Sequence, residues 1–269
     1  MSEISSAHNH RWETGDDYER YMGRWSRLVA RAFVTWLDLG SSLRWMDVGC
    51  GSGALTVTIL NNCAPQSVFG VDPSADFINH ARQQINDPRA SFAVAGADDL
   101  PAEPDSMDVV VSALALNFMP DPANAIAQFT QATKSRGTIA LYVWDYAGRM
   151  EWLRYFWDAA IALDPKSATL DQAERFPICR PDALRDLFTR AGLQQIEIAP
   201  LDAHTHFQSF DDYWSPFLLG KFPAPAYVAA LTDSKREALR QRLKDTLPTN
   251  ADGSIDLIAR AWAIRGIKP

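Results

Sequence analysis

Three glycines at alternate positions, Gly49, Gly51 and Gly53, separate two apolar segments in the stretch WMDVGCGSGALT. A turn needs glycine either because its backbone is left-handed or because a ligand approaches the backbone closely. Two carboxylates flank this turn: Asp47 comes two residues before the first glycine, and Asp72 comes 19 residues after the last. The pattern predicts a binding turn whose ligand tolerates negative charge.

Two classes of ligand fit such a turn. A dinucleotide brings a pyrophosphate, which favours helix N-terminal amides without a carboxylate nearby. The dinucleotide pattern GxGxxG would place its third glycine at position 54, but this chain has Gly53 followed by Ala54. S-adenosylmethionine (SAM) carries a sulfonium, an ammonium and a carboxylate, and no phosphate. Asp47 and Asp72 therefore favour SAM, with Asp72 at the spacing of an acid that binds a ribose diol.

The elements around the turn alternate between strands and helices. Runs rich in β-branched residues predict the strands, and apolar spacing near 3.6 residues predicts the helices between them. We expect strands at 44–49, 67–72, 90–96, 107–114 and 136–146, and helices at 54–62, 75–85 and 122–133. This alternation predicts an α/β fold with a Rossmann-like, doubly wound, mostly parallel sheet, in which ligands bind beyond the carboxyl ends of the strands.

The alternation stops after residue 146, and two aromatic, helical segments interrupt the remainder of the chain. A capped helix ending at Gly192 and an alternating strand come between them, and a last strand closes a seven-stranded sheet. We therefore divide the chain into a SAM-binding core with an N-terminal closing helix (1–146), a helical aromatic insertion (147–178), a core helix and strand (179–207), a second lid insertion (208–250) and the last core strand (251–269).

Residues 40–145 resemble the class I SAM-dependent methyltransferases that act on small molecules. DVGCGSG resembles the first motif of that family, VFGVDPS its acidic second-strand motif, and ADDLP with MDVVVSALALNFMPDP its third and fourth elements. The resemblance implies an enzyme that transfers the sulfonium methyl of SAM to an O, N or C nucleophile of a small molecule. An NAD-dependent oxidoreductase, and a SAM-binding protein with a regulatory or non-methylation role, are the alternatives.

The resemblance also implies which residues bind the cofactor. The glycine turn would lie under the methionine part, Asp72 would hold both ribose hydroxyls, and Pro73 would pack on adenine. The residues implied are Asp47, Gly49, Cys50, Gly51, Asp72, Pro73, Ala97, Asp98, Ala113 and Leu114.

One position departs from the family pattern. The family often has an acid directly before the alanine of the third element, where it binds the adenine amino group, and this chain has Gly96 there. Either Asp98 replaces that acid, or backbone groups of Ala97 and Asp98 make the contact. A helix cap or a solvated loop acid is the alternative role for Asp98.

The N-terminal segment YERYMGRWSRLVARAFVTWL resembles the helix that closes over the cofactor in many of these enzymes. Tyr18, Tyr21 and Trp25 share one helical face, which a buried core stripe would also explain. Arg24 has the charge to bind the cofactor carboxylate through two hydrogen bonds, and Tyr21 is an alternative ligand.

Methyl transfer from a sulfonium depends mainly on alignment of the nucleophile. A phenol, alcohol or acidic carbon also needs a base, for which His204 and His206 at a strand end are the candidates, although such histidines are often structural or solvated. Asn117 follows the fourth strand, near the transferred methyl in this fold, or supports a turn there. Aromatic insertions fit a pocket for an apolar or planar molecule, unless they only pack on the core. The candidate substrate-binding residues are Trp144, Tyr146, Tyr213 and Trp214.

Composition limits the partners. The net charge is −7 and no Lys/Arg cluster occurs, which argues against a nucleic-acid partner. Three widely spaced cysteines predict neither a disulfide framework nor a zinc site, and no other metal site is expected. The chain has no apolar run of about 18 residues and no signal-like N-terminus, so we expect a cytoplasmic protein without a membrane partner. A homodimer remains open.

Overall fold

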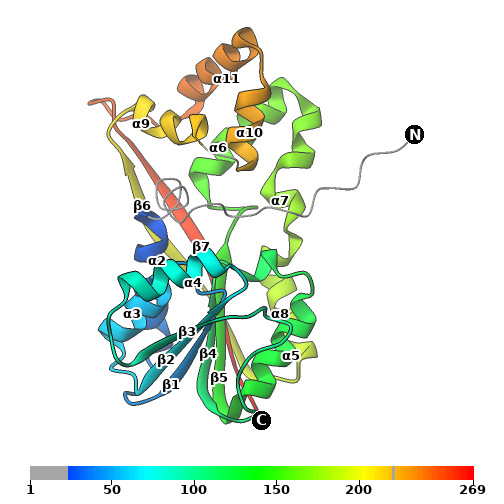
Figure 1. The fold of residues 1–269 in the computed structure, drawn as a ribbon. Coiled ribbons are helices and arrows are strands. Elements are labelled where there is room, and N and C mark those ends of the chain that lie inside the picture. Colours follow the sequence, from blue (N-terminus) through cyan, green and yellow to red (C-terminus); the bar gives the residue numbers. More distant parts are fainter. Residues whose placement is uncertain (1–23, 220–221) are drawn as a thin grey trace.

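Seven strands form one sheet in the computed structural model, which describes residues 24–219 and 222–269 (Figure 1). The sheet order is β3-β2-β1-β4-β5-β7-β6, with β7 antiparallel to both of its neighbours and the first five strands parallel. The prediction of a seven-stranded, mostly parallel sheet is confirmed. The strands are β1 (Arg44–Val48), β2 (Ser67–Asp72), β3 (Ala90–Val94), β4 (Met107–Ala113), β5 (Thr133–Trp144), β6 (Gln194–Phe207) and β7 (Ile255–Ile267).

Helices cover both faces of the sheet (Figure 1). On one side α2 packs on α3, and on the other α5 packs on α8. Local sequence sets their ends: Asp121 caps α5 by accepting from two backbone amides, and Gly192, with φ +76°, follows α8. The core helices are α2 (Arg24–Leu37), α3 (Ala54–Asn62), α4 (Ala75–Gln84), α5 (Pro122–Ala132) and α8 (Pro181–Arg190).

The central strands are buried on both faces. Val109, Val110 and Val111 of β4 are at most 1% exposed, and β5 is buried from Thr138 to Trp144. Near-continuous apolar runs are the pattern of parallel strands that helices cover on both sides. This rigid layer fixes where the carboxyl ends of β1, β2 and β4 meet.

The two segments expected to be insertions supply the remaining helices. The first follows β5 and holds α6 (Glu151–Leu163), η3 (Pro165–Leu170), α7 (Gln172–Arg175) and η4 (Pro177–Cys179). The second follows β6 and holds α9 (Phe210–Trp214), η5 (Ser215–Leu218), α10 (Pro223–Ala230) and α11 (Asp233–Thr246). Because β5 and β6 run in the same direction, both segments leave the sheet at one end.

These two segments pack together into one helical layer beyond that end of the sheet (Figure 1). Helix α6 contacts α11, and Phe156 of α6 stacks on Phe217 of η5 with 4.4 Å between ring centroids. Trp152 lies 4.8 Å from the same ring. Within the two described ranges, no helix is both long and apolar enough to span a membrane.

Candidate functional site

The glycine turn follows β1, and all three of its glycines have positive φ: +73° at Gly49, +52° at Gly51 and +91° at Gly53. Two of them also make room for neighbouring side chains. A Cβ on Gly49 would lie 2.6 Å from Cβ of Ala115, and one on Gly53 would overlap Ile85. Gly49 and Gly53 are therefore required by packing within the protein.

Gly51 has no such neighbour. Apart from Gly51 itself and its two chain neighbours, no described atom lies within 4 Å of the position that its Cβ would take. Its N–H donates to Oδ2 of Asp72 at 3.0 Å, which fixes the turn against the end of β2. The backbone of Gly51 therefore presents an open face between two carboxylates.

Asp47 of β1 is completely buried behind this turn. Its Oδ2 accepts a hydrogen bond from the Thr56 hydroxyl at 2.7 Å, and its Oδ1 has no partner among the described residues. Burial raises the pKa of this carboxyl to about 7, opposed by the Thr56 hydrogen bond and supported by the charge of Asp72. A buried carboxylate oxygen without a partner is costly, so this site suits a ligand that brings a donor or a positive charge.

Asp72 ends β2, directly across the turn from Asp47. Its Oδ2 accepts from Gly51 and its Oδ1 from the N–H of Ser74 at 2.8 Å. Burial raises the pKa of Asp72, and the two amide hydrogen bonds oppose that rise. A carboxylate has about four lone-pair sites, so the two amides leave acceptor capacity for ligand hydroxyls. Pro73, the next residue, is exposed.

The residue that departs from the family pattern has a structural counterpart. A Cβ on Gly96 would overlap Oδ1 of Asp98. The carboxylate of Asp98 therefore occupies the space where an acidic side chain at position 96 would begin. The replacement of that acid by Asp98 stays a prediction.

The end of β4 has an unusual backbone. Leu114 has φ +55°, a left-handed value that is rare for a residue with a side chain, and its N–H donates to the carbonyl of Tyr142 at 2.8 Å. The short helix η2 (Leu116–Phe118) follows. Its Asn117 has a buried Nδ2 without a hydrogen-bond partner in the part of the chain that the structure describes. Backbone strain and an unpartnered donor are features that collect at binding sites.

The candidate bases lie elsewhere. His204 and His206 are exposed on β6, and Nδ1 of His206 lies 2.8 Å from Oδ1 of Asp256. Strand β6 is the outermost strand, with β4, β5 and β7 between it and β1, which is roughly 19 Å at about 4.8 Å per strand. The placement gives a base role no support, and that role stays a prediction.

The candidate substrate-binding aromatic residues are buried. Trp144, Tyr146, Tyr213 and Trp214 are 2%, 8%, 0% and 5% exposed. The Tyr213 hydroxyl donates to the carbonyl of Trp152 at 2.8 Å, and the Trp214 ring packs against Phe217. Tyr213 thus joins the second inserted segment to the first, and Trp214 packs within the second. Tyr146 instead follows β5, at the end of the sheet where the candidate site lies.

The N-terminal candidates are described only in part. Arg24 begins α2, and Tyr18 and Tyr21 lie outside the described residues. Trp25 is buried, with its ring centroid 5.0 Å from that of Trp152. The helix therefore reaches the first inserted segment through Trp25.

Three residues at the candidate site were not identified as site residues from the sequence: Thr56, Phe118 and Phe176. Thr56 resembles any helical threonine until the structure shows its hydroxyl on Asp47. Phe118 follows Asn117 directly, so its place after the fourth strand was a usable signal. Phe176 had no such signal, because its position depends on how the first inserted segment folds.

Part of the chain matches a known protein family. Residues 46–141 match the family model described as a methyltransferase domain. The malonyl-[acyl-carrier protein] O-methyltransferase of Acetivibrio thermocellus is 26% identical over 126 residues, which cover 46% of this chain and 44% of that protein. The ubiquinone biosynthesis O-methyltransferase of Methylococcus capsulatus is 30% identical over 139 residues, which cover 49% of this chain and 56% of that protein. The matches span about half the length of these relatives.

Solved structures share the fold over most of the chain. A putative methyltransferase from Bacillus halodurans has a TM-score of 0.59 and 12% identity, covering 89% of this chain and 98% of that one. A phosphoethanolamine N-methyltransferase 2 of Haemonchus contortus, solved in complex with SAM, has a TM-score of 0.58 and 17% identity, covering 94% of this chain and 56% of that one. Residues 46–141 thus match a methyltransferase domain, and the chain has the seven-stranded fold of the class I SAM-dependent methyltransferases.

Proposed function

We propose that this chain transfers the methyl group of SAM to an O, N or C nucleophile of a small, apolar or aromatic molecule by in-line displacement. The observation that carries the proposal is the open, left-handed Gly51 between two carboxylates. An open backbone face admits a ligand, and the carboxylates select one that carries positive charge.

The residues at the turn fit SAM group by group. The unpartnered Oδ1 of Asp47 fits the cationic methionine part, with Gly49, Cys50 and Gly51 forming the surface beneath it. Asp72 has acceptor capacity for the two ribose hydroxyls, and Asp98, whose carboxylate lies beside Gly96, would replace the acid for the adenine amino group. The exposed Pro73 offers a surface for adenine, and the backbone of Ala113 and Leu114 would meet the methionine ammonium.

When bound, SAM supplies a methyl group already activated by its sulfonium. The chain then has to position the acceptor and exclude water, which can contribute about 7–11 kcal/mol to catalysis. Thr56 holds the Asp47 carboxylate in one orientation, and the strained Leu114 directs the chain from β4 into η2. The inserted helical layer lies beyond the same end of the sheet, where it can exclude water.

A dinucleotide fits this turn less well. Its pyrophosphate would meet the fully buried carboxyl group of Asp47, and no basic side chain among the described residues pairs with that group. Placing a pyrophosphate there would add repulsion between like charges. Asp47 therefore favours SAM over NAD.

Calorimetric titration of the purified chain tests this assignment. We expect a micromolar dissociation constant for SAM, no measurable heat with NAD, and S-adenosylhomocysteine as product once a nucleophilic acceptor is supplied. Binding of NAD in place of SAM would overturn the proposal. Tight SAM binding without turnover across acceptors with O, N and C nucleophiles would instead support a regulatory role.

A further inference from the structure

Three aromatic rings meet where the inserted helical layer joins the sheet. Phe118 follows β4 in η2, Tyr146 follows β5, and Phe176 comes after α7. The rings of Phe118 and Phe176 lie edge to face with 5.4 Å between centroids, and Phe176 lies 5.8 Å from Tyr146. We call these three residues the aromatic cluster. It lies at the carboxyl ends of two adjacent parallel strands, where this fold binds ligands.

The aromatic cluster adjoins the glycine turn. The residues on either side of η2, Ala115 and Met119, are the two that a Cβ on Gly49 would meet, at 2.6 Å and 3.9 Å. The short helix that carries Phe118 therefore packs against the first glycine of the turn. A molecule resting on Phe118 would lie beside any ligand bound at that turn.

Phe118 is also unusual in its exposure. It is 40% exposed, and it is the single aromatic residue among the large apolar side chains exposed in the described ranges. Its neighbour Asn117 holds the buried, unpartnered Nδ2. An unpartnered buried amide is costly, and an –NH₂ group can pair only with an acceptor atom such as oxygen. An apolar ring surface and a donor for oxygen thus come from consecutive residues of one short helix.

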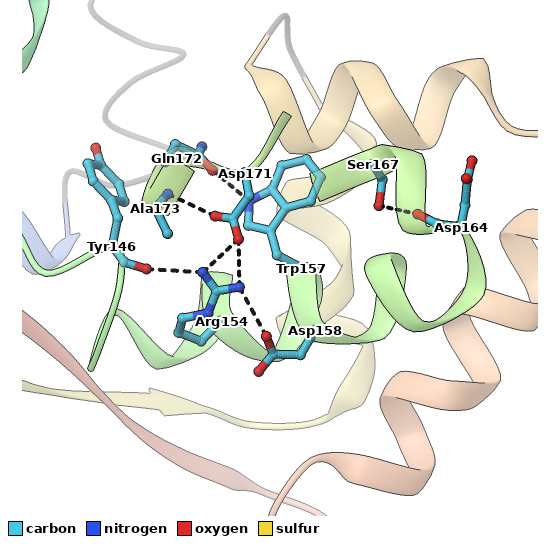
Figure 2. Close-up of polar contacts among 9 residues, drawn as sticks. All are labelled: Tyr146, Arg154, Trp157, Asp158, Asp164, Ser167, Asp171, Gln172 and Ala173. Atoms are coloured by element: carbon cyan, nitrogen blue, oxygen red, sulfur yellow. Dashed lines mark hydrogen bonds and ion pairs between the residues drawn. The ribbon is translucent and has the colours of Figure 1, made fainter. Parts of the chain in front are cut away.

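Figure 2 shows the polar contacts of Arg154 and Asp171, which hold the segment that precedes Phe176. Arg154 of α6 donates to the carbonyl of Tyr146 at 3.2 Å and to Oδ2 of Asp171 at 2.8 Å. Asp171 in turn caps α7 by accepting from Ala173 at 2.9 Å. Because α7 is a single turn that ends at Arg175, with Phe176 as its C-cap, these contacts tie the Phe176 backbone to the end of β5.

We infer that the methyl acceptor is a planar aromatic molecule with a hydroxyl group, held with its ring against Phe118 and Phe176 and its oxygen on Nδ2 of Asn117. This inference rests on the proposed function and names the substrate class of that site. Aromatic rings favour edge-to-face and offset contacts with flat ligands. A hydrogen bond from Asn117 favours the ionised form of the oxygen, which is the better nucleophile.

The reaction balances without a further reactant. The acceptor oxygen forms a bond to the methyl carbon, the carbon–sulfur bond breaks with its electron pair remaining on sulfur, and the hydroxyl proton passes to water. An amine nitrogen has a single lone pair, which it uses to attack the methyl carbon, so it cannot accept from Asn117 during transfer, whereas a phenolic oxygen keeps a further lone pair for that hydrogen bond. Asn117 therefore selects oxygen, and the two phenylalanines select a flat ring.

A matched pair of probes tests the inference on the full chain saturated with S-adenosylhomocysteine. 2-Naphthol is flat and aromatic, whereas decahydro-2-naphthol has the same carbon skeleton and oxygen without planarity. Calorimetry should show 2-naphthol binding at least tenfold more tightly. Phe118→Leu and Phe176→Leu should each weaken 2-naphthol binding about three- to tenfold. Phe210→Leu, the same change in a partly buried ring of α9, is the control and should change it less than twofold.

The affinity for SAM, measured on each variant, separates the two proposals. It should stay within twofold of the wild-type value in Phe210→Leu, and in Phe118→Leu and Phe176→Leu it should fall less than the affinity for 2-naphthol, since none of these rings belongs to the glycine turn. The inference is overturned if 2-naphthol fails to bind, if both probes bind equally, or if the Phe118 and Phe176 variants bind 2-naphthol like wild type. If the wild-type chain does not bind SAM, the proposed function is overturned instead.

Discussion

At the scale of single residues, the proposed function predicts that Asp47 couples ligand binding to protonation. It is fully buried, and one of its oxygens has no partner among the described residues. With a pKa of about 7, a large fraction is protonated at neutral pH in the free protein. A cationic ligand favours the carboxylate, so ligand binding lowers that pKa and releases a proton.

The affinity for SAM should therefore rise with pH. A ligand that selects the ionised Asp47 gains about tenfold in affinity between pH 6 and pH 8, because the carboxylate fraction increases through its pKa and then levels off. Asp47→Asn should bind SAM more weakly and lose this rise. Calorimetric titrations of the wild-type and Asp47→Asn proteins between pH 6 and pH 8 measure the effect. Titration of the amino group of SAM affects both proteins equally, so it cancels in the comparison. Parallel pH profiles would show that Asp47 does not contact the cationic part.

At the scale of elements, the first inserted segment depends on one buried ion pair. Arg154 of α6 and Asp171 before α7 have side chains 16% and 5% exposed. The pair joins α6 to α7 and, through the Tyr146 carbonyl, to the end of β5 (Figure 2). Removal of one partner leaves a buried charge without compensation, which is the costly way to break such a pair.

Arg154→Met should lower the free energy of unfolding by about 3–5 kcal/mol, because Asp171 then stays buried without its cation. The double variant Arg154→Met with Asp171→Asn should recover part of that loss, since asparagine can still cap α7. Denaturant titration of the single and double variants measures the coupling between the two side chains. Strictly additive losses would mean that the ion pair does not hold these elements together.

The elements of the core were predictable because their signals are local. The apolar runs of β1, β2 and β4 and the cap of α5 lie within short stretches of sequence. The arrangement of the inserted helices was not, because Phe156 and Phe217 pack together across 61 residues of chain. The histidine candidates show the same limit: a strand end is visible in the sequence, but the place of β6 at the edge of the sheet is not.

At the scale of the whole molecule, the sheet and the inserted layer position different parts of the proposed site. The sheet brings the glycine turn, the end of β2 and the end of β4 to the carboxyl ends of its parallel strands. The sequence predicted this arrangement because each motif follows a predicted strand. The inserted layer brings Phe176 to the same end of the sheet from a segment more than 50 residues beyond β4. The elements that carry the proposed cofactor half of the site were thus predictable, whereas the proposed acceptor half depends on long-range packing.

The affinity of SAM for two glycine variants tests the central claim most directly. Gly51 and Gly192 both have positive φ and no described atom within 4 Å of the position that a Cβ would take, so alanine costs each about 1–2 kcal/mol of stability. Gly51 lies in the binding turn, whereas Gly192 follows α8. Calorimetry should show at least a tenfold loss of SAM affinity for Gly51→Ala and less than a twofold change for Gly192→Ala. Equal SAM affinity in the two variants would contradict the account.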